Sequence, residues 1–396
     1  MKHPIRIIIT TFLVILITTI VLYVMIIPKT VSQTSITDNL LPAVAVADNE
    51  LTETNPTTPA VPERIPVTHM AMPDPVRAVY MSSWIASSSN LRSKIVDLAK
   101  TTEINAIIID IKDSTGKVSF PIDNALINEI GSTENRIRDI DEFINELHSH
   151  GIYVIGRISV FQDPYLTHEK PEWAIVRKSD GAIWKDRKGL SFLSPAKPEV
   201  WDYITTLAIE SHKIGFDEIN FDYIRFPSDG NIADIQYPDP SLSKADYIEN
   251  FFKHLDQVVR KENNIPTSAD LFGMVTTAND DLGIGQVLER AIPYFDAIAP
   301  MIYPSHYPKN FEGYANPAAN PGGVITIAME GGNAKAIAMG KTSAVFRPWL
   351  QDFNMGANYG PTEIRAQINA LAKLGIHSYM MWDPANTYTA GGYLPE

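Results

Sequence analysis

Short apolar segments alternate with amphipathic segments between Val76 and Asp383, and this alternation limits the possible folds more than any other feature. The segments expected to form strands cover residues 76–84, 106–112, 153–160, 218–226, 267–274, 296–303, 343–349 and 378–383. The segments expected to form helices between them cover residues 91–101, 140–150, 198–214, 244–262, 286–292 and 362–374. Strands that alternate with helices in this way predict a (β/α)8 TIM barrel.

Two long stretches, 162–194 and 305–341, show no sustained period and are expected to be enlarged loops that shape a cleft. The alternative topology is an open, doubly wound sheet. That topology usually carries a glycine-rich phosphate loop after its first strand. Here the first strand leads into Ser82–Ser87, which contains no glycine, so the barrel is favoured.

The N-terminal sequence is typical of a membrane anchor. Residues 7–27 carry no charge and are about as long as a bilayer-spanning helix requires. Lys2 and Arg6 precede them, which predicts that the N-terminus stays in the cytoplasm and the rest of the chain lies outside it. We therefore expect a cytoplasmic tip and transmembrane anchor in residues 1–28. Cleavage as a signal peptide, followed by secretion, is the alternative.

Residues 29–75 are rich in Thr, Pro, Asn, Asp and Glu and show no period. Such a segment cannot bury enough apolar surface to fold alone, so we expect a disordered linker, with the barrel domain in residues 76–396.

Charge and cysteine content exclude several classes of function. The formal net charge of −13 argues against nucleic acid as a partner. The absence of cysteine rules out disulfides, thiolate metal sites and a cysteine nucleophile.

The segment from Phe216 to Asp229 contains the most unusual carboxylate. Apolar and aromatic side chains alternate there with Asn220 and Asp222, so Asp222 lies near the C-terminal end of a strand. A carboxylate in such surroundings is costly unless it is paired or used in catalysis. The structural alternative is an Asp that caps a loop or pairs with Arg225.

In a TIM barrel the active site lies at the C-terminal ends of the strands. The candidate substrate-binding residues at those ends are Trp84, Asp110, Lys112, Asp113, Arg157, Asn220, Arg225, Tyr303, His306, Arg347, Trp349, Trp382 and Asp383. Asp222, Asp270 and Asp352 stand at the ends of the fourth, fifth and seventh expected strands. Carboxylate pairs cleave glycosidic bonds, and aromatic rings stack on sugars.

Asp222 and Asp270 would lie on adjacent strands, whose backbones are about 4.8 Å apart. Their carboxyl groups could therefore approach the separation of about 5 Å found in retaining glycosidases, or splay to the inverting distance. Two other chemistries stay open, although we expect neither a metal nor a cofactor. Asp110, Asp113 and Asp383 could hold a metal ion, and Lys112 could form a Schiff base.

Five motifs resemble a bacterial glycoside hydrolase family with a TIM-barrel domain that was formerly of unknown function. They are Ile108–Asp113, Phe221–Pro227, Ala299–Tyr307, Arg347–Phe353 and Met381–Asp383. By analogy with α-amylase-like barrels, the resemblance implies that Asp222 is the nucleophile, Asp270 the acid/base and Asp352 a stabilising carboxylate. Asp270 departs from that pattern, since the superfamily commonly has Glu there.

The combined expectation is a membrane-anchored, extracytoplasmic glycoside hydrolase that acts on a bacterial surface or environmental polysaccharide. Asp383 is a second candidate for charge stabilisation. Trp84, Tyr303, Trp349 and Trp382 would form the floor on which sugar rings stack. A carbohydrate-binding barrel without catalysis is the alternative, and an envelope scaffold is a third.

Overall fold

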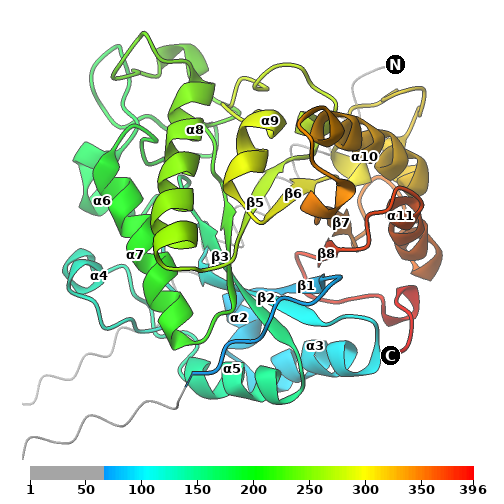
Figure 1. The fold of residues 1–396 in the computed structure, drawn as a ribbon. Helices are drawn as coiled ribbons and strands as arrows, with labels where there is room; N and C mark the ends of the chain where they lie inside the picture. The colour runs from blue at the N-terminus through cyan, green and yellow to red at the C-terminus, as the bar shows by residue number, and fades with distance from the viewer. Residues whose placement is uncertain (1–66) are drawn as a thin grey trace, which may run out of the picture. The chain divides into compact units, whose positions relative to one another are not determined.

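The computed structural model describes residues 67–396, which form a closed barrel of eight parallel strands in sequence order (Figure 1). The barrel closes where β1 pairs with β8. The strands are β1 (Arg77–Met81), β2 (Ala106–Lys112), β3 (Tyr153–Ser159), β4 (Glu218–Asp222), β5 (Thr267–Phe272), β6 (Ala297–Met301), β7 (Trp349–Gln351) and β8 (Tyr379–Trp382). The TIM-barrel prediction is confirmed.

The expected membrane anchor and most of the expected linker lie outside the described residues. Within residues 67–396, no helix combines the length and the apolar character needed to cross a membrane.

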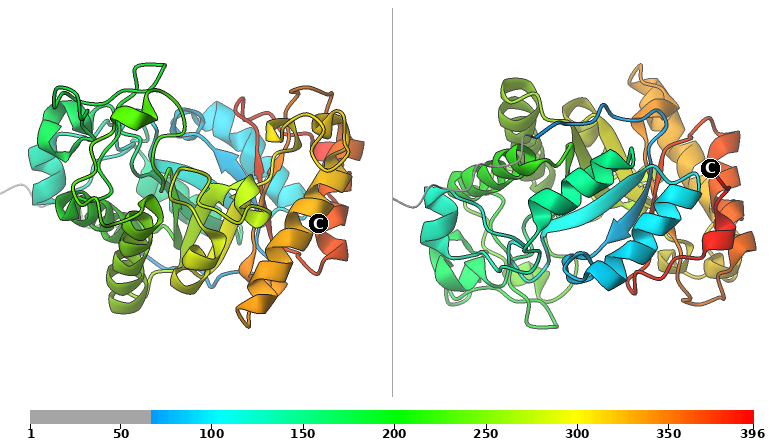
Figure 2. Two further views of the ribbon diagram at one scale, coloured as in Figure 1. Left: turned by 90° about the horizontal axis from the view of Figure 1, so that it is seen from above. Right: turned by 90° about the horizontal axis from the view of Figure 1, so that it is seen from below.

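Helices surround the barrel on its outer side (Figures 1 and 2). The longer ones are α3 (Ser89–Thr101), α5 (Ile140–Ser149), α7 (Pro198–Ile214), α8 (Lys244–Leu255), α10 (Pro321–Ala338) and α11 (Pro361–Lys373). The shorter ones are α2 (Ser83–Ala86), α4 (Ala125–Ile130), α6 (Leu166–Glu169) and α9 (Leu288–Ala291). A π-helical turn, Asp256–Glu262, extends α8.

Local sequence explains where several helices begin and end. Helix α7 has Pro198 in its first turn, where the missing N–H costs nothing, and ends at Gly215, whose φ is 136°. Helix α8 begins with a capping box, in which Ser243 and Asp246 each bond the other's backbone N–H. These signals are local, so they can be identified in the sequence.

Helix α10 occupies residues that we expected to be a loop. It contains four glycines and has no polar face, so neither propensity nor periodicity indicates it. Its glycines allow close packing: a Cβ on Gly331 would lie 2.7 Å from the Thr276 carbonyl oxygen. Tertiary contacts with α11 and with the turn after β5 therefore outweigh the weak local preference.

Strand β7 is shifted relative to the prediction of residues 343–349. A 3-10 turn, Ser343–Val345, takes the beginning of that segment, and the strand starts only at Trp349. Arg347 therefore lies at the N-terminal end of the strand, and Trp349 becomes a residue of the barrel interior. This shift changes the expected roles of Arg347 and Trp349.

The base of the barrel, at the N-terminal ends of the strands, is closed by a buried polar layer. Glu218 accepts hydrogen bonds from Arg347 at 2.7 Å and from the Ser268 hydroxyl at 2.6 Å. The chain enters from this side, since the Met70 N–H donates to Asp217 at 2.7 Å. The last residues of the expected linker therefore contact the barrel, at the end opposite to the candidate site.

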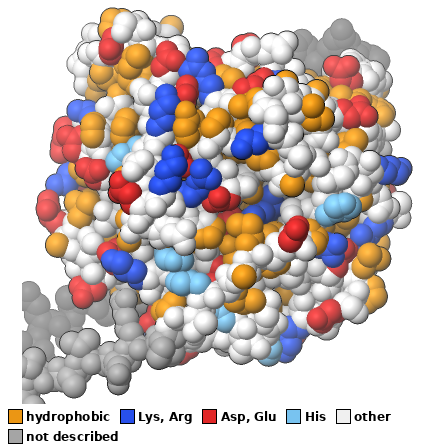
Figure 3. All heavy atoms as spheres, viewed as in Figure 1, with side chains coloured by type: hydrophobic (Ala, Val, Ile, Leu, Met, Phe, Trp, Pro, Cys, Tyr) orange, Lys and Arg blue, Asp and Glu red, His pale blue; other side chains and the backbone are white. Residues whose placement is uncertain are grey.

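The outer surface carries charges of both signs. On the face seen in Figure 3, Lys and Arg side chains lie among Asp and Glu side chains over α8 and α9. Ion pairs such as Arg290–Asp246, at 2.6 Å, and Lys253–Glu249, at 3.0 Å, account for part of this pattern. Exposed pairs of this kind contribute little to stability.

Candidate active site

A cavity of about 580 Å³ opens at the C-terminal ends of the strands. This volume lies within the range of small-molecule sites. It is lined by Tyr80, Asp110, Asp113, Ser114, Arg157, Asp222, Tyr223, Arg225, Asp270, Phe272, Gly273, Met274, Met301, Tyr303, His306, Tyr307, Trp349 and Trp382. Strands β1 to β5 each contribute a charged residue or a tyrosine, β6 contributes Met301, and β7 and β8 contribute tryptophans.

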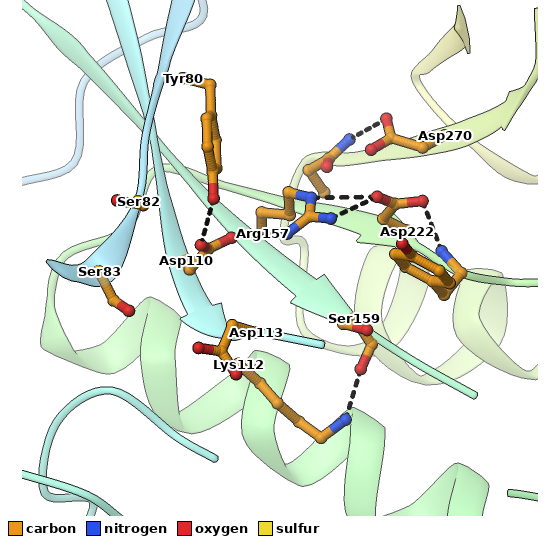
Figure 4. Close-up of polar contacts among 12 residues, drawn as sticks. Tyr80, Ser82, Ser83, Asp110, Lys112, Asp113, Arg157, Ser159, Asp222 and Asp270 are labelled. Carbon is orange, nitrogen blue, oxygen red and sulfur yellow. Dashed lines mark hydrogen bonds and ion pairs between the residues drawn. The ribbon is translucent and has the colours of Figure 1, made fainter. Parts of the chain in front are cut away.

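Asp222, the last residue of β4, accepts three hydrogen bonds. Arg157 donates to Oδ2 through Nε at 3.1 Å and through Nη2 at 2.5 Å. The Tyr223 N–H donates to Oδ1 at 2.6 Å. Tyr223 has a φ of 53°, a conformation that is rare for a bulky residue, and it follows the catalytic candidate directly. The guanidinium and the backbone together fix the orientation of Asp222 (Figure 4).

Arg157 links Asp222 to a second carboxylate, Asp110. Its Nη1 donates to Asp110 Oδ1 at 2.7 Å, and the Tyr80 hydroxyl donates to Asp110 Oδ2 at 2.6 Å. Burial opposes the charge of Arg157, but Asp222 and Asp110 outweigh it and raise its pKa, so it stays cationic. Burial raises the pKa of Asp110, in spite of Arg157 beside it. The arginine is thus a fixed positive charge between β2 and β4.

Asp270, on β5, has a different environment. Its Oδ1 accepts hydrogen bonds from Asn220 Nδ2 at 2.8 Å and from Trp349 Nε1 at 2.7 Å. Its Oδ2 is buried and has no hydrogen-bond partner among residues 67–396. Burial and, second, the charge of Asp222 raise the pKa of Asp270 well above the usual value. A carboxyl group of this kind keeps its proton at a pH where an exposed Asp is ionised.

The register of the barrel places these two carboxyl groups side by side. Phe221 of β4 pairs with Ala269 of β5, and the next residue on each strand is Asp222 and Asp270. Both side chains line the cavity. A carboxyl group with a raised pKa beside a carboxyl group that an arginine hydrogen-bonds is the arrangement of a general acid with a nucleophile or base.

Aromatic rings form one wall of the cavity. The Tyr303 and Trp382 rings lie 5.1 Å apart, and the His306 ring lies 5.3 Å from Tyr303. Phe353 supports the wall from behind, 5.1 Å from Trp382. Burial lowers the pKa of His306, so its ring is neutral and adds to the aromatic surface. Such a wall suits the C–H faces of sugars.

Two charged residues from the predicted set also reach the cavity. The Arg225 guanidinium carbon lies 4.7 Å from the centre of the Phe272 ring and 5.2 Å from that of Tyr223. Its Nη1 donates to the Phe226 carbonyl at 3.0 Å, and burial lowers its pKa. Arg225 therefore does not form the ion pair with Asp222 that was one of the two structural alternatives. Asp113 pairs with Arg136.

Asp352 and Asp383 are near the strand ends but outside the cavity lining. Asp352 accepts hydrogen bonds from the Thr389 N–H at 2.9 Å and from the Tyr393 hydroxyl at 2.8 Å. Asp383 accepts from the Ala385 and Thr387 N–H groups at 3.0 and 2.7 Å. Side chains alternate between the two faces of a strand, and Trp349 and Trp382 face inward. Asp352 and Asp383 therefore point away from the cavity and bind the C-terminal loops.

Lys112 also lies outside the cavity. Its Nζ pairs with Asp163 at 2.8 Å and donates to the Ser159 carbonyl at 2.5 Å, and both charged side chains are fully buried. The cause is a register shift in β2 between Asp110 and Lys112. A bulge redirects the side chains that follow it, so Lys112 no longer shares the inward face with Asp110 (Figure 4). This position fits neither substrate contact nor a Schiff base.

We predict that Lys112→Met destabilises the fold by about 3–5 kcal/mol, because it leaves the Asp163 carboxylate buried without its counter-charge. Urea unfolding followed by circular dichroism measures this loss. The double variant Lys112→Met/Asp163→Leu should recover much of it, since it removes both charges. A Lys112→Met protein with unchanged stability and a raised KM would instead assign the lysine to substrate binding.

Three other predicted residues have different positions from those expected. Arg347 forms a buried ion pair with Glu218 at the base of the barrel, far from the strand ends that carry the site. Trp84, on α2, is 61% exposed and does not line the cavity. Asn220 lies beneath the cavity lining and acts through Asp270, to which it donates.

Several cavity residues were not predicted from the sequence. Tyr223 follows Asp222, and Phe272, Gly273 and Met274 follow Asp270 within two to four positions. These residues could have been predicted from their positions shortly after Asp222 and Asp270, because residues that follow a strand-end carboxylate form the rim of the cavity. Tyr307 follows His306 in the same way. Gly273 is required there, because a Cβ would lie 2.4 Å from the Met301 carbonyl oxygen.

The metal hypothesis finds no support in the described part of the chain, where no group of three His, Asp or Glu side chains is placed to hold an ion. Asp110, Asp113 and Asp383 each bind different partners: Arg157 and Tyr80, Arg136, and loop N–H groups.

Comparisons with solved structures support the fold. The PgaB (BpsB) glycoside hydrolase domain of Bordetella bronchiseptica is 17% identical with a TM-score of 0.59, covering 79% of this chain and 95% of that one. An α-L-fucosidase (isoenzyme 2) of Paenibacillus thiaminolyticus is 16% identical with a TM-score of 0.52, covering 80% of this chain and 48% of that one.

A hypothetical protein from Ruminiclostridium thermocellum is 33% identical with a TM-score of 0.45, covering 52% of this chain and 98% of that one. The search of curated proteins found no match. A family model described as "Putative glycosyl hydrolase domain" matches residues 78–388, which include the whole barrel apart from the first residue of β1. The chain therefore belongs to this glycosyl hydrolase family, and the barrel is its glycosidase domain.

Proposed function

We propose that the protein hydrolyses the glycosidic bonds of a polysaccharide outside the cytoplasm, with Asp222 and Asp270 as the catalytic pair. The observation that carries this proposal is the contrast between the two neighbouring carboxyl groups. Asp222 accepts hydrogen bonds at both of its oxygens, whereas Asp270 has a raised pKa and one oxygen without a partner in the described chain.

The roles follow from this contrast. Protonated Asp270 gives its proton to the glycosidic oxygen as the bond from that oxygen to the anomeric carbon breaks. Asp222 acts in one of two ways. It attacks the anomeric carbon directly with its own electron pair, and water later displaces it, or it takes the proton from a water molecule whose oxygen forms the new bond to that carbon. The arginine between Asp110 and Asp222 limits the freedom of Asp222 to rotate, which preserves the attacking geometry.

The cavity also supports a sugar substrate. Its wall of Tyr303, Trp382 and His306 offers apolar faces, while Asp113 and Arg225 offer hydrogen-bonding groups at the rim. This mixture of aromatic surface and polar groups matches a pyranose ring, which has both C–H faces and hydroxyl edges.

The experiment that tests this proposal uses the full-length chain purified in mild detergent. It is incubated with cell-wall, exopolysaccharide, α-glucan and β-glucan preparations, and new reducing ends are measured. The double variant Asp222→Asn/Asp270→Asn is the matched control. Release by the wild type alone supports the proposal. Equal release by both proteins, or none by either, contradicts it, and retention of a glycan by an inactive wild type would establish the carbohydrate-binding alternative.

We further propose that residues 7–27 anchor the protein to the membrane with the barrel outside. The apolar run and the positive residues before it support this orientation. The chain should therefore remain in the membrane pellet after alkaline carbonate extraction, and protease added to spheroplasts should degrade the barrel. A soluble, shortened protein in the medium would instead establish cleavage and secretion.

A further inference from the structure

An exposed tryptophan, Trp84, is linked to the cavity lining through Arg136 and Asp113. Trp84 is 61% exposed, the most of any large apolar side chain in the described chain except Ile337. One face of its indole ring is covered by Arg136, whose guanidinium carbon lies 4.3 Å from the ring centre. The large exposed fraction leaves the rest of the ring to solvent. Single exposed apolar side chains are common on protein surfaces, so exposure by itself does not mark Trp84 as a binding site.

Arg136 is itself fixed, with a side chain only 5% exposed. Its Nη1 donates to the Ser83 hydroxyl at 3.0 Å, and it pairs with Asp113 and with Glu134. Three anchors on three different segments therefore hold the guanidinium in place. A cation over an indole face stabilises the ring orientation by a cation–π interaction, so Trp84 is held in one position.

This support is continuous with the catalytic cavity. Asp113 pairs with Arg136 on one side and lines the cavity on the other, and its neighbour Ser114 lines the cavity too. Only two side-chain contacts therefore separate the indole ring from the cavity wall. The neighbouring strand ends, β1 and β2, carry Tyr80 and Asp110 of the cavity itself (Figure 4).

We propose that Trp84 is a sugar-binding subsite for units of the substrate chain that extend beyond the cavity, and that the enzyme therefore prefers a polymer to short oligosaccharides. This inference rests on the proposed function, since the occupant is the chain whose scissile bond lies between Asp222 and Asp270. A flat, rigid ring binds the C–H face of a pyranose at little entropic cost.

The test compares one polysaccharide that the wild type cleaves with a fraction of the same polymer sized to three or four units. Trp84→Ala should lower kcat/KM on the polymer about tenfold, through KM, and change it less than twofold on the short fraction. Trp84→Phe should retain most of the activity on the polymer. Leu91→Ala, an exposed apolar residue on α3 that is 40% accessible, is the matched control and should change neither value.

Binding is measured separately in the Asp270→Asn background, by the mobility of the protein in native gels that contain the polymer. Adding Trp84→Ala should remove most of the retardation. Unchanged KM and retardation in Trp84→Ala would overturn the subsite while the wild-type activity upholds the proposed function. Equal losses on long and short substrates would also overturn it, by assigning Trp84 to the cavity. A wild type that cleaves nothing and is not retarded would overturn both proposals.

Discussion

Asp222→Asn should reduce kcat by a factor on the order of 10⁴ to 10⁶, the range observed when a nucleophile or its essential partner is removed. Asn has nearly the same shape and still accepts a hydrogen bond from Arg157, so the cavity should keep its form. It cannot supply the electron pair that attacks the anomeric carbon or accept a proton from water. The measurement is the initial rate of reducing-end release on the polysaccharide that the wild type cleaves.

The matched control for this variant is Asp352→Asn. Asp352 also follows a strand, but it binds the C-terminal segment through Thr389 and Tyr393. We expect Asp352→Asn to lower the melting temperature and leave kcat within about twofold of the wild type. A loss of activity in Asp352→Asn alone, with Asp222→Asn active, would reverse our assignment. The anomeric configuration of the first product, read by NMR, then distinguishes direct attack from attack by water.

Asp270→Asn should lower kcat by about 10²- to 10⁴-fold on a natural polysaccharide, the usual contribution of a general acid. The loss should be much smaller on an aryl glycoside with an acidic phenol as leaving group, because that oxygen departs without a proton. Comparison of the two substrates therefore separates a proton donor from a residue that merely shapes the cavity. Equal losses on both substrates would contradict the assignment.

The pH profile gives a second test of Asp270. The proton donor must be protonated, so activity is present below its pKa and is lost as the pH rises through that value. Burial and the charge of Asp222 raise this pKa, so the basic limb should lie well above the value near 3.9 of an exposed Asp. Asp270→Asn should abolish the limb. The Trp349 hydrogen bond favours the ionised form, so Trp349→Phe should move the limb to higher pH.

The sequence determined the architecture of the barrel and the pair at its centre. Strand-length apolar segments such as Ala106–Lys112 alternate with helices that carry their own start and stop signals, and this pattern is compatible with few folds. Asp222 and Asp270 were predicted to lie together because each belongs to an apolar strand segment, and neighbouring parallel strands bring their C-terminal ends together. Both inferences depend on local periodicity and on the order of the elements, so neither requires knowledge of the tertiary contacts of a residue.

The tertiary structure decided which face of a strand each side chain occupies and which residues it contacts. One residue of shift reverses the face of every side chain in a strand. The bulge in β2 turned Lys112 away from the cavity, and the late start of β7 moved Arg347 to the base and made Trp349 a hydrogen-bond donor to Asp270. Both shifts result from pairing with neighbouring strands, which the local sequence does not encode.

Helix α10 also depends on tertiary structure, because its glycines are accommodated where α11 and the turn after β5 pack closely against the helix. The pKa of Asp270 also depends on groups from four other positions in the chain: Asp222, Asn220, Arg157 and Trp349. The sequence by itself thus predicted that Asp222 and Asp270 lie at the C-terminal end of the barrel. Only the tertiary structure decided which of them face the cavity and which carry a proton, because burial and charge are set by neighbours distant in the chain.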